Sequence, residues 1–389
     1  MKALISGGGI AGLTLGILLK EAGFEPLVVE REAALRTEGY MMDFFGSGWD
    51  VAERMGLVPK LRAIRYPIDA MQFVDDHGKS FDTVPISVVS RALGDNYVYL
   101  RRSDLERILY ERALAIGLSV QFGRTIESLR QEEAAVHVTF DDGAEASFDL
   151  AFGADGVHSR VRTLVFGEEH QFDRFLGAYV AAFHLEDHDF DLDSALKLHE
   201  ETDRVGAFYP LDATRMDATY AFRHHEIDIA QERRLDFVRE EFRGAGWILE
   251  QVLDDYRATE PIFFDSMTQI VMPSWHQGRV ALLGDACGCL TLLAGQGSHM
   301  AMAGAYVLAT ELVRHGGDYA AAFAAYQALL KPAVDRRQRD AALFAKVFIP
   351  SERSRPRLRR LTIRVLFNPL VFPLVLRWFG VGSVLAGYA

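Results

Sequence analysis

The sequence predicts an α/β fold in which a Rossmann-like dinucleotide-binding domain carries an inserted, mainly antiparallel β domain and is followed by C-terminal helices. Three observations lead to this prediction. A strand, a glycine-rich turn, a helix and a second strand occupy the first 30 residues; short strands alternate from 177 to 271; and a buried strand at 280–283 precedes an alanine-rich helix. The buried strand and helix after residue 280 repeat the strand-and-helix pattern of the first domain. We therefore expect the chain to return to that domain and the β domain to be an insertion.

The length and composition are those of a globular protein with two domains. The chain has 389 residues, of which 49% are hydrophobic and 25% charged, which excludes disordered, collagen-like and disulfide-scaffold proteins. Its net charge of -12 would repel a phosphate backbone, so no nucleic-acid partner is expected. Cys287 and Cys289 lie too close in sequence for a relaxed disulfide, and the first residues do not form a secretory signal. We therefore expect a cytoplasmic protein.

The first domain starts with a βαβ unit. Lys2–Ser6 is a short apolar strand that ends at three consecutive glycines. Apolar residues then recur at helical spacing from Ile10 until Gly23, and Pro26–Glu30 supplies the second strand. Further along, the pattern predicts a hairpin of 71–75 with 80–84, a helix that follows Ser103 and stops at Gly117, and a hairpin of 136–140 with 146–152.

The inserted domain and the return to the first domain complete the expected order. Strands are predicted at 179–183, 205–209 and 218–222, an amphipathic stretch at 233–253, and a long helix at 297–315. The expected division is 1–176 for the first part of the dinucleotide-binding domain, whose hairpin near 71–84 reaches toward the substrate domain, 177–271 for the substrate-binding domain, 272–330 for the second part of the dinucleotide-binding domain, and 331–389 for a C-terminal helical extension.

The turn after the first strand carries a dinucleotide-binding motif. Gly7 permits a tight turn, Gly9 lets a pyrophosphate approach the backbone, and Gly12 allows the helix to pack closely on the strand. Glu30 ends the second strand, where a carboxylate accepts a hydrogen bond from a ribose hydroxyl. The motif alone does not separate FAD from NAD, and the alternative is a glycine turn without a ligand. The predicted contacts are Gly7, Gly9, Ile10, Ala11, Gly12, Glu30 and Arg31.

Two later segments resemble signatures of the class A flavoprotein monooxygenases, the family that includes p-hydroxybenzoate hydroxylase. They are Asp149–Arg162, and Gly278–Ala286 followed by Gly295-Gln296-Gly297. Arg102-Ser103-Asp104-Leu105 resembles a third element, an arginine that opens the helix beside the flavin. The resemblance implies the p-hydroxybenzoate hydroxylase fold, FAD as the cofactor and NAD(P)H as the reductant. Only one glycine motif is visible, so the nicotinamide donor is expected to dock transiently.

The residue types in these segments suit a flavin. Asp285 can accept a hydrogen bond from a ribityl hydroxyl, and a helix that begins near Ser298 adds a positive dipole end beside an isoalloxazine carbonyl. The resemblance implies that Asp155-Gly156 contacts FAD and the pyrophosphate region of the nicotinamide donor. The alternatives are a helix cap for Asp285, an ion pair for Arg102 and a plain turn for Asp155-Gly156. The cofactor contacts predicted here are Arg102, Asp155, Gly156, Gly284, Asp285, Gly295, Gly297 and Ser298.

The chain departs from the family pattern at the loop before the glycine turn. Where the family has Ala-His and then a proline, this sequence has Cys287–Ala294 without proline. Gly304-Ala305-Tyr306 replaces the usual Asp-Ala after the turn. With Phe264–Ile270 and the C-terminal extension, these features are most similar to the tetracycline destructase branch.

The resemblance implies a monooxygenase reaction. NADH or NADPH would reduce the flavin, O₂ would add at its C4a position, and the hydroperoxide would hydroxylate a phenolic or enolic, polycyclic substrate. No protein nucleophile is expected. Arg223 is the candidate for binding an anionic or enolic oxygen, with a surface ion pair as the alternative. Met41 and Phe44 follow Arg36 and Gly39 where the family places residues near flavin and substrate, with core packing as the alternative.

Other functions are weighed against this one. A flavin-dependent reductase of an isoprenoid lipid shares the fold, and a non-enzymatic protein could bind a hydrophobic drug. The arginine-rich stretch before the apolar segment 365–376 is compatible with membrane contact, but we favour a helix that closes over the protein. No metal site is predicted, because the two cysteines lack a second ligand pair. A monomer is expected.

Overall fold

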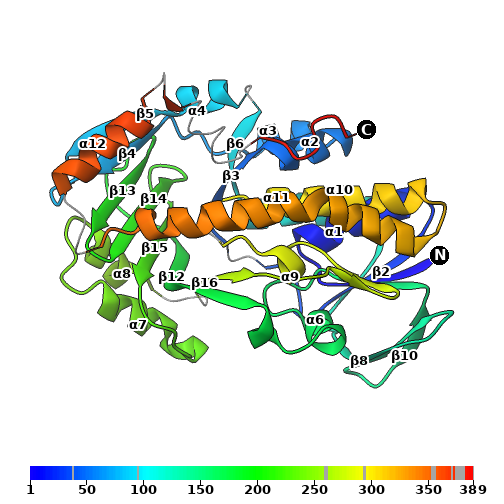
Figure 1. Ribbon diagram of the computed structural model, residues 1–389. Coiled ribbons are helices and arrows are strands. Elements are labelled where there is room, and N and C mark those ends of the chain that lie inside the picture. Colours follow the sequence, from blue (N-terminus) through cyan, green and yellow to red (C-terminus); the bar gives the residue numbers. More distant parts are fainter. Residues whose placement is uncertain are drawn as a thin grey trace.

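The computed structural model describes residues 1–389 except 37–38, 94–95, 258–261, 292–294, 352–355, 369–370, 373–381 and 389. A parallel sheet flanked by long helices lies on one side of the molecule, and a larger antiparallel sheet lies on the other (Figure 1). This arrangement confirms the predicted α/β fold with an antiparallel β domain.

The parallel sheet is the dinucleotide-binding half. Its strand order is β17-β18-β11-β1-β2-β7, with β1 in the middle, parallel to β2 and β11. Four of the five residues of β1 are buried, as expected for a strand covered on both faces. The strands are β1 Lys2–Ser6, β2 Glu25–Glu30, β7 Ser119–Phe122, β11 Leu150–Gly153, β17 His276–Gln277 and β18 Val280–Leu282.

Helices from distant parts of the chain cover this sheet. α1 (Ile10–Glu21) packs against α5 (Arg102–Ala115) and against α10 (Gly297–Arg314), which in turn contacts α2 (Gly46–Arg54) and α11 (Tyr319–Phe348). The first and last thirds of the sequence therefore share one hydrophobic core.

The second predicted hairpin is wrong in its last part. β9 (Val136–Phe140) pairs with β10 (Glu145–Phe148) and with β8 (Ile126–Gln131), but the chain then changes sheets. Asp149 marks the change, because its backbone N–H donates to the carbonyl of Lys2 at 2.9 Å and its carboxylate accepts from the N–H of Lys2 at 2.7 Å. The following residues form β11 beside β1 instead of extending the hairpin.

The second large sheet is called the substrate-side sheet, because most of it lies in the segment 177–271 for which the sequence predicts substrate binding. It has seven strands in the order β16-β12-β15-β14-β13-β4-β5. The hairpin predicted near 71–84 is its edge, since β4 runs parallel to β13 and antiparallel to β5. Two helices, α7 (Arg234–Glu241) and α8 (Leu249–Asp255), pack on this sheet through an aromatic core. The strands are β4 Ala70–Val74, β5 Ser80–Pro85, β12 Asp173–Leu185, β13 Ala195–Glu201, β14 Arg204–Pro210, β15 Met216–Arg223 and β16 Phe263–Ile270.

Short elements connect the two halves. The two-stranded pair of β3 with β6 lies between the sheets and contributes to both cores. The remaining elements are β3 Met41–Phe45, β6 Tyr97–Arg101, α3 Val58–Ala63, α4 Ile86–Ala92, α6 Arg160–Val165, α9 Asp285–Gly288, and the 3₁₀ turns Glu169–Gln171 and Gln231–Arg233.

The C-terminal part is built differently from the predicted division. α11 is one helix of 30 residues that includes Pro332, so the boundary expected at 330 falls inside it. α12 (Pro356–Leu366) lies beside the substrate-side sheet (Figure 1), where Arg359 forms an ion pair with Glu200 of β13 at 2.6 Å. None of the described helices is long and apolar enough to cross a membrane, and the predicted segment 365–376 lies partly outside the described residues.

Candidate functional site

The glycine turn after β1 has the geometry that its motif predicts. Gly7 has φ +109°, and a Cβ there would lie 2.3 Å from the carbonyl oxygen of Ala154. A Cβ on Gly12 would lie 1.9 Å from the carbonyl oxygen of Gly7. A Cβ on Gly9 would lie 3.5 Å from the Oε1 of Glu106 and would meet no backbone, so the backbone there remains open to a bound group. Two of the glycines are thus needed for packing and one leaves room.

Glu30 holds the turn from the side of β2. Its carboxylate accepts hydrogen bonds from the N–H of Gly8 at 2.6 Å and from the N–H of Glu32 at 3.0 Å. These two bonds fix the carboxylate at the end of the strand, beside the glycine turn, where the sequence predicts a ribose contact. Arg31 is exposed and forms an ion pair with Glu32 at 3.4 Å.

A charged pair on α5 faces the same turn. Arg102 opens the helix and forms an ion pair with Glu106 at 2.8 Å, and both groups lie where a Cβ on Gly9 would meet them at 3.9 and 3.5 Å. Tyr40 completes this side, because its carbonyl accepts from the N–H of Arg102 at 3.1 Å. Burial raises the pKa of the Tyr40 phenol, which also senses the charges of Arg102 and Asp285. The sequence predictions include Arg102 but not Tyr40 or Glu106.

Asp285 lies where the first turns of two helices converge. A Cβ on Gly284 would lie 3.0 Å from the Cβ of Ala11 in α1 and 3.7 Å from that of Ala301 in α10. Neither helix has an acidic residue in its first turn or a side chain that caps its N-terminus, so both positive dipole ends remain uncovered by acidic groups of their own. Burial raises the pKa of Asp285, and the positive charge of Arg102 partly offsets this effect.

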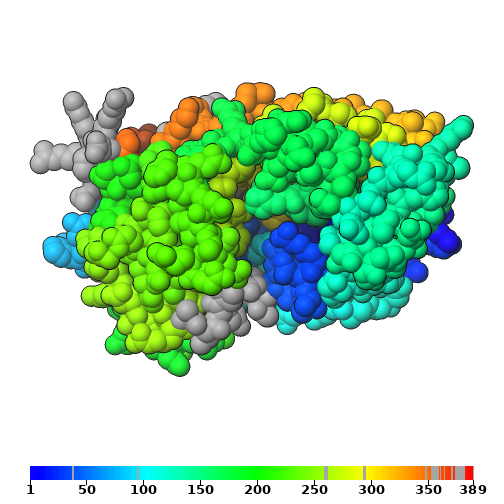
Figure 2. All heavy atoms as spheres, turned by 90° about the horizontal axis from the view of Figure 1, so that it is seen from below, coloured from blue at the N-terminus to red at the C-terminus, as the bar shows by residue number. Residues whose placement is uncertain are grey.

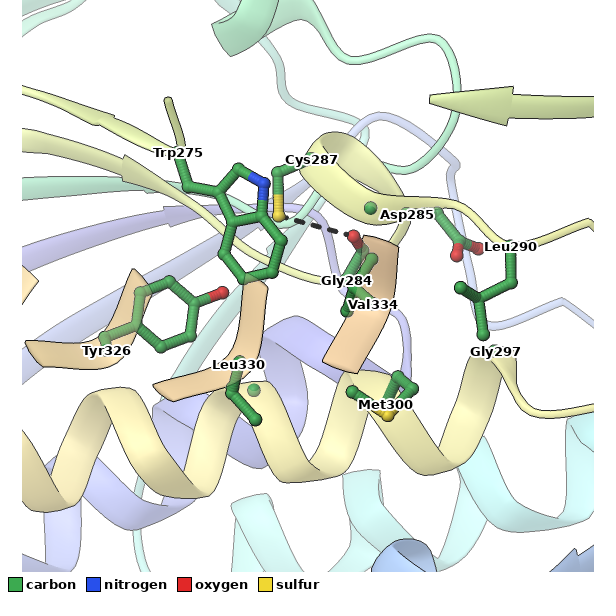
Figure 3. Close-up of a pocket in the computed structure, with 12 residues that line it drawn as sticks. Trp275, Gly284, Asp285, Cys287, Leu290, Gly297, Met300, Tyr326, Leu330 and Val334 are labelled. Atoms are coloured by element: carbon green, nitrogen blue, oxygen red, sulfur yellow. Dashed lines mark hydrogen bonds between the residues drawn. The ribbon is translucent and has the colours of Figure 1, made fainter. Parts of the chain in front are cut away.

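The turn before α10 completes this region. Gly295 has φ +59° with open space around it, and a Cβ on Gly297 would lie 3.8 Å from the Oδ1 of Asp285. Ser298 is the second residue of α10. Figure 3 shows Asp285, Leu290 and Gly297 together beside the helix, at a pocket whose other wall is formed by Tyr326, Leu330 and Val334 of α11.

These residues fit FAD. They follow one path from Glu30, past the open backbone of Gly9 and the Arg102 side chain, to Asp285 and the turn at Gly297. A bound FAD would be held by Glu30 at its adenosine end, by the first turn of α1 at its phosphates, and by Asp285 and the N-terminus of α10 at its flavin end.

Asp155 and Gly156 form the turn between β11 and α6, and their contact with FAD remains a prediction. The carboxylate of Asp155 points inward, where it accepts hydrogen bonds from Ser6 at 3.3 Å, from the N–H of Val161 at 3.1 Å and from the hydroxyl of Ser159. Asp155 thereby holds the start of α6, while Gly156 forms the turn with φ +80°. Its contact with a nicotinamide donor remains a prediction.

Arg223 is engaged away from the glycine turn. Its guanidinium donates to the carbonyl oxygens of Lys346 at 2.8 Å and Ile349 at 2.7 Å, and it lies 3.3 Å from Asp203. These contacts join the end of β15 to the C-terminal end of α11. They give Arg223 a structural role, and substrate binding by this residue remains a prediction.

Met41 and Phe44 lie in the protein core, on opposite faces of β3. Phe44 is fully buried in the core of the dinucleotide-binding half, and Met41 belongs to the cluster shared with the substrate-side sheet. The core-packing alternative therefore describes their positions in this structure.

The turn at Gly295–Gly297, beside which a bound flavin would lie, is called the flavin turn. An aromatic row runs from His299, just after this turn, to the substrate-side sheet. The ring centroids are 4.4 Å apart for His299 and Phe45, 6.1 Å for Phe45 and Tyr97, 5.3 Å for Tyr97 and Tyr99, and 6.3 Å for Tyr99 and Tyr209. Burial raises the pKa of all three tyrosines, so each phenol stays protonated near neutral pH and can donate a hydrogen bond. No local sequence pattern predicts this row, because its members come from four separate elements, α10, β3, β6 and β14.

The molecular surface is hollowed on the face that Figure 2 shows. Figure 2 shows a recess between the green substrate-side half of the molecule and a blue N-terminal segment. Among the described residues no cluster could hold a metal ion, and both cysteines are free and buried.

Comparisons with known proteins agree with this geometry. Residues 1–339 match the family model described as FAD binding domain. A flavin-dependent monooxygenase from an unknown prokaryotic organism is 32% identical over 360 residues, which cover 90% of each chain. The crystal structure of the tetracycline destructase Tet(55) has a TM-score of 0.83 at 30% identity and covers 98% of both chains. Klebsiella pneumoniae HpxO complexed with FAD and uric acid shares the fold, with a TM-score of 0.80 at 22% identity over 96% of this chain and 97% of that one.

Proposed function

The chain belongs to the FAD-binding-domain family of flavin-dependent monooxygenases, and from this premise we propose that it hydroxylates a phenolic or enolic polycyclic compound with electrons from NADH or NADPH. The observation that carries this proposal is the convergence of the N-termini of α1 and α10 on Gly284 and Asp285. Bound FAD supplies the redox and oxygen-activating chemistry, and the chain supplies its orientation and electrostatics.

The FAD site is the path of residues from Glu30 to Gly297 described above. Its end at Asp285 and Gly297, where the flavin would lie, favours a reduced cofactor. A reduced flavin carries negative charge near its N1–C2 carbonyl, and the uncovered helix end at Gly297 would stabilise that charge. Burial raises the pKa of Asp285, which makes its ionised form less favourable there than that of an exposed carboxylate. Both effects act without a catalytic acid from the protein.

The aromatic row supports the proposed substrate class. A flat polycyclic molecule would pack on Phe45 and the tyrosine rings, while the protonated phenols of Tyr99 and Tyr209 would donate to its phenolic or enolic oxygens. The 30% identity with Tet(55) over almost the whole chain supports a tetracycline-like ring system within this class. The apolar residues around the row would keep water away from the reacting atoms.

The nicotinamide donor is proposed to bind only transiently. Among the described elements, the glycine turn after β1 is the one strand–turn–helix unit with the dinucleotide motif, and FAD would occupy it. A reductant would therefore reach the flavin from the surface, in keeping with the predicted docking without a second Rossmann domain.

The test starts with the visible spectrum of the purified protein, which should show bound FAD. NADH and NADPH consumption is then measured in air and without O₂, over a panel of phenols, anthracyclines and tetracyclines, with ¹⁸O₂ to trace the inserted atom. The proposal expects substrate-stimulated consumption that requires O₂ and a product that carries one ¹⁸O atom. Turnover without O₂ would instead indicate the reductase alternative, and tight binding by a colourless protein would indicate a drug-binding protein.

A further inference from the structure

The loop that leads to the flavin turn is held by buried polar side chains on both sides. On its N-terminal side, the Nε2 of Gln338 donates to the carbonyl oxygens of Ile270 at 2.7 Å and Cys289 at 2.9 Å. The Nε2 of Gln269 donates to the carbonyl oxygen of Leu290 at 3.1 Å and to that of Gln338 at 2.7 Å. Gln269 is fully buried and Gln338 is 5% exposed, so these bonds form away from water.

The C-terminal side of the same loop is held by the neighbouring residue of α11. The Nε of Arg337 donates to the side-chain oxygen of Gln296 at 2.8 Å, and its Nη2 donates to the carbonyl oxygen of Gly382 at 2.9 Å. Gln296 lies between Gly295 and Gly297, in the turn at the flavin end of the groove. Arg337 therefore connects this turn to the C-terminal tail.

The residue that directly follows the carbonyls held by Gln338 and Gln269 has a strained backbone. Thr291 is buried and has φ +103°, a conformation that costs a β-branched residue about 1–3 kcal/mol and persists only where neighbouring contacts impose it. The carbonyls of Cys289 and Leu290, just before Thr291, are the ones that Gln338 and Gln269 hold.

We infer that Gln269, Arg337 and Gln338 are positioning residues for the flavin, and we call them the α11 clamp. This inference shares one assumption with the proposed function, which is that FAD binds along the residues from Glu30 to Gly297. The clamp does not act by contact with the flavin: Arg337 holds Gln296 within the turn at Gly295–Gly297, where α10 begins, and Gln338 and Gln269 hold the carbonyls of Cys289 and Leu290. The link through Gly382 makes the C-terminal tail part of the same support.

The test uses three variants and a matched control. Arg337→Ala and Gln296→Ala each remove the hydrogen bond between these two side chains. Gln338→Ala frees the carbonyls of Ile270 and Cys289. Arg336→Ala is the control, because Arg336 is the adjacent, largely exposed arginine of α11. FAD affinity is measured by titration of the apoprotein, and the flavin environment by the absorption and fluorescence of the bound cofactor. Arg337→Lys keeps a positively charged nitrogen that can donate a hydrogen bond. Its flavin spectrum should therefore be closer to that of the wild type than the spectrum of Arg337→Ala.

Thiol labelling gives a readout that needs neither FAD nor substrate. Cys287 and Cys289 are the only cysteines of the chain, and they are 2% and 7% exposed. Loss of the bond to the Cys289 carbonyl should speed labelling by a thiol reagent by about 10-fold in Gln338→Ala, because local opening becomes easier. The rate should stay at the wild-type value in Arg336→Ala.

The expected result is weaker FAD binding by about 10-fold and an altered flavin spectrum in Arg337→Ala and Gln296→Ala, with no further loss in the double variant. Unchanged FAD affinity and spectra in both single variants would overturn the inference. Gln296→Ala changes a turn at the protein surface, so it tests the idea even where Gln338→Ala does not fold. A wild-type protein that binds no FAD would refute the proposed function, whereas unchanged thiol labelling in Gln338→Ala would refute the clamp.

Discussion

The phenol of Tyr97 donates a hydrogen bond to the carboxylate of Asp43, across the antiparallel pair of β3 and β6. Burial raises the pKa of Asp43, and burial together with the Asp43 charge raises the pKa of Tyr97. The Nε2 of His299 lies 3.0 Å from the backbone carbonyl of Asp43, so the pair also adjoins the first turn of α10. The pair therefore lies between the first turn of α10 and the tyrosines Tyr99 and Tyr209.

Removal of the Tyr97 hydroxyl should destabilise the protein. Tyr97→Phe leaves the Asp43 carboxylate without its phenol donor, which we expect to lower the free energy of unfolding by about 1–3 kcal/mol. Urea unfolding of Tyr97→Phe, Asp43→Asn and the double variant measures the coupling. The decrease in the free energy of unfolding should be smaller in the double variant than the sum of the two single decreases, by at least about 0.5 kcal/mol. Strictly additive decreases would show that the hydrogen bond contributes nothing to stability.

Glu30→Ala should weaken FAD binding. The carboxylate fixes the Gly8 N–H and would accept a ribose hydroxyl, so we expect a loss of about 1–3 kcal/mol, or about 5- to 150-fold in Kd. Fluorescence titration of the apoprotein with FAD measures it. Glu32→Ala is the control, since Glu32 pairs only with the exposed Arg31 in the described structure, and its Kd should match the wild type. Equal affinities for all three proteins would place the adenosine elsewhere.

His299 should make stability depend on pH. Burial lowers the pKa of His299 from its usual 6.5 to about 4, so the folded state holds the imidazole neutral. Its stabilising contribution is complete above pH 6.5 and is lost as the pH falls toward 4, by up to about 1.4 kcal/mol per pH unit. Urea unfolding at several pH values should show this slope in the difference between the wild type and His299→Gln.

Arg223→Ala separates the structural from the substrate-binding role of this residue. Loss of the bonds to Lys346 and Ile349 should lower the free energy of unfolding by about 1–3 kcal/mol and leave the KM for substrate unchanged. Exposed Arg243 provides the control, and Arg243→Ala should change neither quantity. A KM raised 10-fold or more at unchanged stability would restore the predicted role of Arg223 in substrate binding.

The features that the sequence predicts are those with local signals. The glycine turn, the βαβ unit and the hairpin near 71–84 follow from periodicity and turn residues within short windows, and the family follows from motifs in their expected order. Tyr40, Glu106 and the aromatic row carry no such signal, because each is brought to the site by packing between distant elements. The change of sheets at Asp149 was missed for the same reason, since an apolar run does not show which strand it pairs with.

The order of strands in the parallel sheet has a consequence for synthesis on the ribosome. β1 pairs with β11 through Ile5 and Phe152, and β11 pairs with β18 through Phe152 and Ala281. The nascent chain cannot complete this sheet until β18 has emerged, so cofactor loading must follow translation of most of the polypeptide. Fragments that stop before β18 would leave the edge of β11 unpaired and prone to aggregate, which makes full-length expression a requirement for soluble holoprotein.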